Sequence, residues 1–118
     1  MTTIVTKRVY DPPAAQDGQR ILVDRLWPRG LRRDAAALDD WAKDVAPTTA
    51  LRKWFHHRPE QFAEFTRRYH DELAANPAVG ELLRRIGKGK ATLLYAARDP
   101  AINNAVVLAE FLRRAPPQ

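Results

Sequence analysis

Residues 24–30, Asp-Arg-Leu-Trp-Pro-Arg-Gly, form the densest group of side chains in the sequence that could carry chemistry. Arg25 and Arg29 offer planar guanidinium groups that suit phosphate or carboxylate oxygens, and Trp27 offers a ring on which a planar ligand can stack. Asp24 can orient an arginine or act as a general base. The same residues also suit a buried aspartate–arginine pair that holds a loop, with Trp27 filling space in the core.

Three short apolar runs, at residues 3–10, 20–24 and 91–96, have the composition of β-strands. The centre of the second run, residues 21–23, is continuously apolar, as in a strand that is covered on both faces. Long helical segments separate the second run from the third. This order predicts an α/β fold, a small three-layer, Rossmann-like domain in which helices flank a short, mainly parallel sheet.

Four helices are predicted from apolar residues at helical spacing that follow a start signal. The signals are a capping threonine, a first-turn proline, or a pair that combines a cap with a proline: Thr48-Thr49, Pro59, Asn76-Pro77 and Asp99-Pro100. The last pair predicts a helix from Pro100 to about Arg114. Residues 31–45 are ambiguous between helix and loop.

Every predicted strand ends in charged or aromatic residues. Ligands of open parallel sheets bind beyond the carboxyl ends of the strands, so these side chains are expected to converge on one site. The residues predicted to bind a ligand there are Arg8, Arg25, Trp27, Arg29, Tyr95 and Asn104, with Asp24 as the candidate catalytic base.

Asp99, Asn103 and Asn104 follow the third predicted strand. Free N–H groups at a helix start attract anions, but a capping aspartate already occupies that position and its charge would oppose an anion. Asp99 is therefore interpreted as a plain cap. A pair of amides on an otherwise apolar helix is unusual, which favours a place in the site for Asn103 and Asn104.

Metal and cofactor chemistry finds little support in the sequence. The histidines are His56, His57 and His70, and the adjacent pair cannot share one helix face, so no metal site is predicted. The chain has no cysteine, which excludes disulfides, zinc–thiolate sites and a thiol nucleophile. No glycine-rich phosphate loop occurs, and no cofactor is predicted.

The 118 residues include 20 Lys+Arg against 14 Asp+Glu, a net charge of +6. Most of the basic residues are arginine, which permits an anionic ligand or nucleic acid without demonstrating either. Basic pairs scattered among the predicted helices favour solvated faces over one nucleic-acid surface. No apolar run is long enough to span a bilayer, and the start lacks the apolar core of a secretory signal. We therefore expect one cytoplasmic domain over residues 1–118, with no membrane partner.

Together these segments resemble the YeaO-like bacterial proteins, domain-of-unknown-function family 488. The resemblance rests first on residues 24–30 and on Lys7-Arg8-Val9-Tyr10-Asp11 before them. It continues through Trp41, residues 43–47, residues 51–55, Tyr69, residues 94–99 and residues 104–108. The resemblance covers nearly the whole chain and implies a small bacterial cytoplasmic α/β protein, but it supplies no reaction.

The sequence favours binding of an anionic, nucleotide-like small molecule at the carboxyl ends of the strands, and leaves open whether the protein is an enzyme. A less favoured alternative is a nucleic-acid-binding or accessory protein with an arginine-rich surface, which predicts one continuous positive face. A third is a non-catalytic protein-interaction module whose strand-end residues are only structural. Shifted pKa values clustered in a real pocket would count against that module.

Overall fold

The computed structural model describes residues 2–114, where four parallel strands form one sheet in the order β1-β4-β2-β3. The strands are β1 (Thr3–Arg8), β2 (Gln19–Leu22), β3 (Asp40–Trp41) and β4 (Lys90–Tyr95). Three of them lie where the sequence predicts strands, and the short β3 falls in the ambiguous segment 31–45. The predicted α/β fold with a parallel sheet is confirmed.

The helices are α1 (Arg33–Ala36), α2 (Thr49–Phe55), α3 (Phe62–Ala74), α4 (Ala78–Ile86) and α5 (Asn104–Arg114). Single 3-10 turns occur at Ala15–Asp17, Lys43–Val45 and Pro59–Gln61. Two predicted caps are confirmed, since Thr48 Oγ1 accepts a hydrogen bond from the Leu51 N–H at 3.2 Å and Asn76 Oδ1 accepts one from the Ala78 N–H at 2.9 Å. Within residues 2–114, no helix has the length and apolar character needed to cross a membrane.

The last helix begins later than predicted, at Asn104 instead of Pro100. Asp99 Oδ1 accepts hydrogen bonds from the N–H groups of Ala101 and Ile102, but these close a turn and not a helix. The cap of α5 is the buried Asn103, whose Oδ1 accepts a hydrogen bond from the Val106 N–H at 3.0 Å. The later start makes Asn104 the first residue of the helix.

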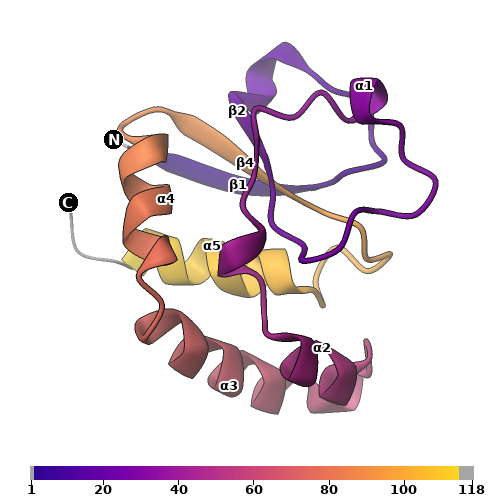
Figure 1. The fold of residues 1–118 in the computed structure, drawn as a ribbon, viewed down its shortest axis with the longest axis vertical. Helices are drawn as coiled ribbons and strands as arrows, with labels where there is room; N and C mark the ends of the chain where they lie inside the picture. The colour runs from indigo at the N-terminus through magenta and orange to yellow at the C-terminus, as the bar shows by residue number, and fades with distance from the viewer. Residues whose placement is uncertain (1, 115–118) are drawn as a thin grey trace.

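The two faces of the sheet are covered unequally. Successive residues of a strand point to opposite faces, and Ile4, Ile21 and Leu93 on one face pack into a large core with side chains of α2, α3, α4 and α5. On the other face Leu22 and Leu94 join a smaller cluster with Val9, Trp27, Leu31, Leu38 and Trp41. Figure 1 shows α1 apart from the four longer helices, across the strands. The third layer thus consists mainly of loop with one short helix.

An ion-pair network centred on Asp17 also lies on this second face. Asp17 Oδ2 lies 3.0 Å from Lys7 Nζ and 2.6 Å from Arg20 Nη1, and it accepts a hydrogen bond from the Ala14 N–H. Burial raises the pKa of Asp17, but the Ala14 N–H and the two cations outweigh it and lower the pKa to about 2. Gly18 follows with φ 65°, where a Cβ would lie 2.4 Å from the Lys90 carbonyl oxygen.

Candidate functional site

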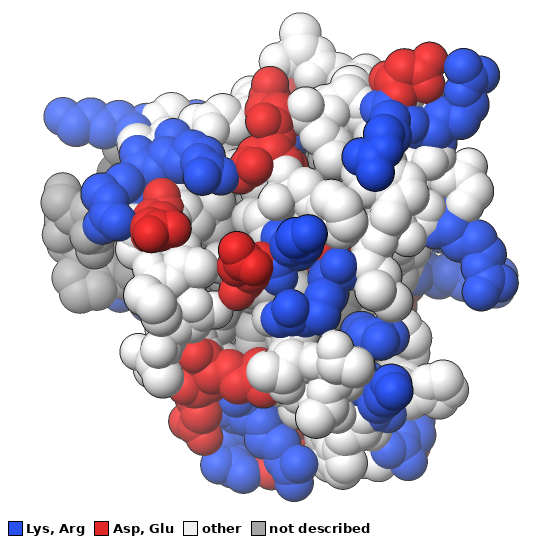
Figure 2. Space-filling view, viewed as in Figure 1, with Lys and Arg blue, Asp and Glu red and all other residues white. Residues whose placement is uncertain are grey.

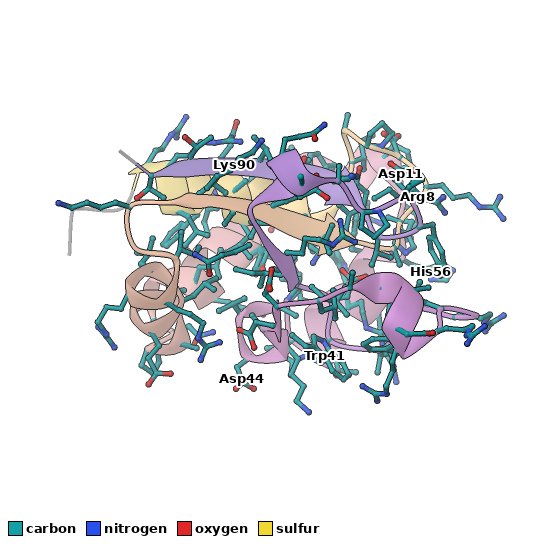
Figure 3. The ribbon with its side chains drawn as sticks, turned by 90° about the horizontal axis from the view of Figure 1, so that it is seen from above. Arg8, Asp11, Trp41, Asp44, His56 and Lys90 are labelled. Atoms are coloured by element: carbon teal, nitrogen blue, oxygen red, sulfur yellow. The ribbon has the colours of Figure 1, made fainter. Side chains whose placement is uncertain are left out.

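A cleft of about 1140 Å³ lies at the carboxyl end of the sheet. Its walls come from the end of β1, the segments that follow β2 and β4, the start of α5, and the α2–α3 region. Figure 3 shows the arrangement from above: Arg8 and Asp11 lie at the same end of the molecule as His56, and Lys90, where β4 begins, lies at the other end. Since all strands run in parallel, their carboxyl ends meet at this one edge, as the sequence predicts.

Arg8 reaches the cleft from the last position of β1. Its Nε donates to the Ala97 carbonyl oxygen at 3.0 Å and its Nη2 to the Ala96 carbonyl oxygen at 3.5 Å, while its guanidinium carbon lies 4.7 Å from the centre of the Tyr10 ring. These contacts fix the guanidinium group without neutralising it, because carbonyl oxygens carry no net charge.

Arg25, in the loop after β2, is held in a similar way. Its Nε donates to the Pro47 carbonyl oxygen at 3.0 Å and its Nη2 to the Ala46 carbonyl oxygen at 3.1 Å. The side chain therefore ties the β2 loop to the segment that leads into α2. Like Arg8, it combines a structural contact with a charge that still faces the cleft.

Asp24 is a half-buried acceptor between β2, β4 and α5. Its Oδ2 accepts a hydrogen bond from the Ala96 N–H at 3.0 Å. Burial raises the pKa of Asp24, and this exceeds the lowering by the Ala96 N–H, the Asn104 side chain and the more distant charges of His57 and Arg52. Within residues 2–114 no arginine forms an ion pair with Asp24, so the aspartate–arginine pair that the sequence also suited is not formed there.

Asn104 lies beside Asp24 because α5 begins there. Its Nδ2 donates to the Val23 carbonyl oxygen at 3.1 Å, which joins the start of α5 to the end of β2. The residue lines the cleft, as the sequence predicts. Asn103 lines it too, but its amide is used in the α5 cap and in a hydrogen bond to the Asp99 carbonyl oxygen.

Trp27 lines the cleft while its ring is packed on the loop side. Its Nε1 donates to the Leu31 carbonyl oxygen, Trp41 packs against it in a T-shaped arrangement with centroids 5.4 Å apart, and Arg33 lies over the ring at 4.6 Å. These contacts hold the loop in place. The stacking of a ligand on Trp27 stays a prediction.

Arg29 lies at the exposed rim of the cleft, in the turn that Gly30 makes. Gly30 has φ 74°, and no atom lies within 4 Å of where a Cβ would be, so glycine is favoured there by backbone conformation and not by crowding. The Tyr10 hydroxyl donates to the Arg29 carbonyl oxygen at 2.7 Å and ties this turn to the end of β1.

Tyr95 is the one predicted binding residue that the structure does not bring to the cleft. It is 3 % exposed and packs in the large core. Burial, with the nearby Asp11, raises the pKa of its hydroxyl. A ligand contact at Tyr95 therefore stays a prediction that the position of the side chain does not support. In the structure the side chain fills the core below the strand ends.

The α2 side of the cleft contributes residues that the sequence reasoning missed. Arg52 and His57 line it, above an apolar floor that includes Phe55 and Phe65, whose rings stack with centroids 4.4 Å apart. Arg52 and Phe55 are three positions apart on a helix and are therefore neighbours on its surface. This spacing is the one sequence signal for this wall. Arg98, which follows β4 and is not among the predicted binding residues, lines the cleft as well.

The charges around the cleft are unequal. Five arginines line it against two carboxylates, Asp24 and Asp99; the arginines are Arg8, Arg25, Arg29, Arg52 and Arg98. None of the five forms an ion pair with a carboxylate in the part of the chain that the structure describes. The lining of the cleft therefore carries more positive than negative side chains, which favours an anion.

Two other kinds of site find less support. Among residues 2–114 no group of three or more metal-ligating side chains could hold a metal ion. On the face drawn in Figure 2, the lysines and arginines form separate groups with uncharged and acidic side chains between them. The continuous positive face expected of a nucleic-acid binder is not seen on that side.

Comparison with known proteins identifies relatives along almost the entire chain. Residues 3–117 match DUF488-N3i, a family described as the inactive DUF488-N3 subclade. The chain is 49 % identical to the uncharacterized protein YeaO of Escherichia coli (strain K12), over 93 % of this chain and 96 % of that protein. It is 45 % identical to the uncharacterized protein Rv3073c of Mycobacterium tuberculosis (strain H37Rv), over 94 % of each chain. No solved structure matches it.

Proposed function

The chain belongs to the YeaO-like DUF488 family, within its DUF488-N3i subclade, and on that premise we propose that the cleft binds an anionic small molecule without converting it. The observation that carries the proposal is the set of five cleft arginines without a carboxylate partner in residues 2–114. Arginine forks match phosphate and carboxylate oxygens.

The distribution of these arginines supports a ligand held from several sides. Arg8 and Arg25 are fixed by backbone carbonyl oxygens, so their charge is preorganised and little side-chain entropy is lost on binding. Arg29, Arg52 and Arg98 are exposed and can close on an anion. Fixed charges inside and adjustable charges at the rim are suited to a small ligand that enters from solvent.

The apolar part of the cleft favours an organic anion over a bare inorganic ion. Phe55, Phe65 and Ile102 line it together with prolines of three different segments. Cofactor and metabolite sites combine such apolar walls with a few polar groups that orient the ligand. A nucleotide-like molecule, with a planar base and a phosphate group, fits both features.

Two observations support the proposal that the protein binds the ligand without catalysing a reaction: the description of its subclade and the contacts of Asp24. The subclade is described as inactive, and the Asp24 carboxyl already accepts the Ala96 N–H that joins β2 to β4. A general base must be able to reach a substrate proton, and one oxygen of this carboxyl already has a structural use. Catalysis by Asp24 is the competing hypothesis, and substitution of this residue tests it below.

Calorimetric titration with adenosine 5′-monophosphate, inorganic phosphate and uncharged adenosine tests the proposal. We expect the monophosphate to bind and adenosine to bind at least about 10-fold more weakly, because a charge-assisted contact contributes about 1.5–3 kcal/mol. Arg29→Ala and Arg52→Ala should each weaken monophosphate binding about 10-fold, with unchanged thermal stability because both side chains are exposed.

Arg84→Ala is the matched control, since Arg84 is an exposed arginine of α4 outside the cleft. The proposal fails if no phosphorylated or carboxylated compound of a broader metabolite panel binds. It also fails if Arg84→Ala weakens binding as much as Arg29→Ala, because binding would then follow net charge. Retention on heparin that falls steeply with salt would favour the nucleic-acid alternative. A cytoplasmic location stays a prediction.

A further inference from the structure

Two consecutive residues between α2 and α3 have positive φ, which is uncommon for residues other than glycine, although asparagine, aspartate and histidine adopt it more often than the rest. His56 has φ 46° and His57 has φ 56°, both in the left-handed region. The Arg58 N–H donates to the Phe55 carbonyl oxygen at 3.1 Å across them. Positive φ at both central residues makes this a turn of the type that usually contains Asn-Gly.

The end of α2 explains the first of the two conformations but not the second. Helices often end with one left-handed residue, most often glycine, and His56 takes this place, with its N–H bonded to the Arg52 carbonyl oxygen. His57 lies one residue further on and is exposed, so burial of its ring in the core does not stabilise its conformation. Strained residues of this kind concentrate at binding sites.

The position of the His57 ring suggests a function for the uncommon backbone conformation of this residue. His57 lines the cleft, whereas His56 does not. Its ring lies 6.2 Å, centre to centre, from Phe55 on the cleft floor. Arg52, near the end of α2, lines the cleft as well.

We propose that His57 is a binding residue for the anionic ligand, held over the cleft by the left-handed turn, and that it forms the α2 side of the anion site together with Arg52. This inference rests on the proposed function. An imidazole N–H donates a hydrogen bond to a phosphate or carboxylate oxygen, and the fixed turn holds the ring where Arg52 supplies a second donor. The ligand class is a phosphate monoester or a carboxylate of similar size.

The test compares His57→Gly with His56→Gly, using adenosine 5′-monophosphate as the probe. Glycine relieves the left-handed backbone at either position, so both variants should unfold at a temperature about 3 °C above that of the wild type. Only His57→Gly should weaken binding of the monophosphate, by about 5-fold or more. His57→Asn tolerates the same backbone and adds a variant that does not loosen the turn; it should also bind more weakly than the wild type.

The outcomes separate this inference from the proposed function. If wild-type protein binds no phosphorylated or carboxylated compound of the metabolite panel, both are overturned. If wild-type protein binds the monophosphate and Arg52→Ala weakens it, but His57→Gly and His57→Asn bind as tightly as wild type, only the role of His57 is overturned. Equal losses of binding in His56→Gly and His57→Gly would also overturn it, because the turn and not the imidazole would then be what the ligand needs.

Discussion

Asp17 is buried and Asp24 is half-buried beside the sheet, and the groups around them differ. Asp17 meets Lys7 and Arg20 at 3.0 and 2.6 Å, and its pKa is lowered to about 2. Asp24 meets a backbone N–H and an amide but no paired cation, and burial raises its pKa. Two arginines of the same cleft, Arg25 and Arg8, bind carbonyl oxygens instead.

The difference separates a structural charge cluster from a candidate binding one. Around Asp17 the opposite charges form ion pairs within the protein, so the network does not need a ligand to balance them. Around Asp24 five arginines and two carboxylates line an open cleft, and the excess charge has no partner within residues 2–114. Both clusters contain aspartate and arginine, so residue type alone does not tell them apart.

Asp17→Asn should have the largest effect on stability. The side chains of Asp17 and Arg20 are 7 % and 6 % exposed, and removing one member of a buried ion pair leaves the other charge without compensation. We expect the free energy of unfolding, measured by urea denaturation, to fall by about 3 kcal/mol. The control is Asp34→Asn in the exposed Arg32–Asp34 pair, which should change it by less than about 0.5 kcal/mol. A loss below about 1 kcal/mol for Asp17→Asn would contradict the contrast between the two clusters.

Acid should act on the two aspartates in opposite directions. Because the pKa of Asp17 is lowered to about 2, its contribution to stability is present above its ordinary pKa of 3.8 and is lost as the pH falls toward 2. Asp17→Asn should therefore flatten the loss of stability between pH 4 and about pH 2. Urea denaturation at several pH values measures this slope, and an unchanged slope in the variant would assign acid sensitivity to other groups.

Asp24→Asn should change stability little and with the opposite sign. The raised pKa of Asp24 means that its contribution is fully present below the ordinary pKa of 3.8 and is lost as the pH rises through its pKa in the folded protein. The variant should therefore gain stability relative to wild type as the pH rises. At pH 7 we expect no loss greater than about 0.5 kcal/mol, because an amide oxygen can still accept the Ala96 N–H. A loss as large as that of Asp17→Asn would show that the Asp24 charge is structural.

The same variant tests whether Asp24 is a base. With adenosine 5′-monophosphate as the probe, Asp24→Asn should keep binding within about 3-fold of wild type, which is less than 1 kcal/mol. A chemical change in any compound of the metabolite panel that wild-type protein catalyses and Asp24→Asn does not would support catalysis and overturn the absence of turnover.

Tyr10→Phe should have the smallest effect. The substitution removes one hydrogen bond at the exposed rim, from the Tyr10 hydroxyl to the Arg29 carbonyl oxygen, and keeps the ring on which Arg8 lies. We expect a loss of about 0.5 kcal/mol in the free energy of unfolding and binding of the monophosphate within 2-fold of wild type. A larger loss of binding with unchanged stability would mean that the Tyr10 hydroxyl itself contacts the ligand.

Sequence patterns predicted the parallel α/β fold because strands and helices have recognisable composition and periodicity within short segments. Thr48 and Asn76 cap the helices that they were expected to cap. The start of α5 was predicted too early because Asp99-Pro100 closes a turn by the same side-chain bonding that begins a helix. β3 was missed because two residues carry no readable periodicity.

The cleft was predicted in part. Six of the predicted residues line it, since a parallel sheet brings the ends of its strands together. They are Arg8, Asp24, Arg25, Trp27, Arg29 and Asn104. Tyr95 belongs to the core because alternation along β4 turns its side chain towards the helices. Arg52 and His57 were missed because α2 reaches the strand ends only through packing between segments distant in the chain.

The sequence by itself determined the family and the order of the main strands and helices along the chain. It also determined the edge of the sheet at which polar residues gather. These follow from local composition, from periodicity and from the geometry that all parallel sheets share. Only the tertiary structure decided which charges are paired. Asp17 lies three residues before Arg20 and forms an ion pair with it, whereas Asp24 directly precedes Arg25 and does not. Pairing depends on where a side chain points and on which carbonyl oxygens lie nearby, and packing across the whole chain sets both.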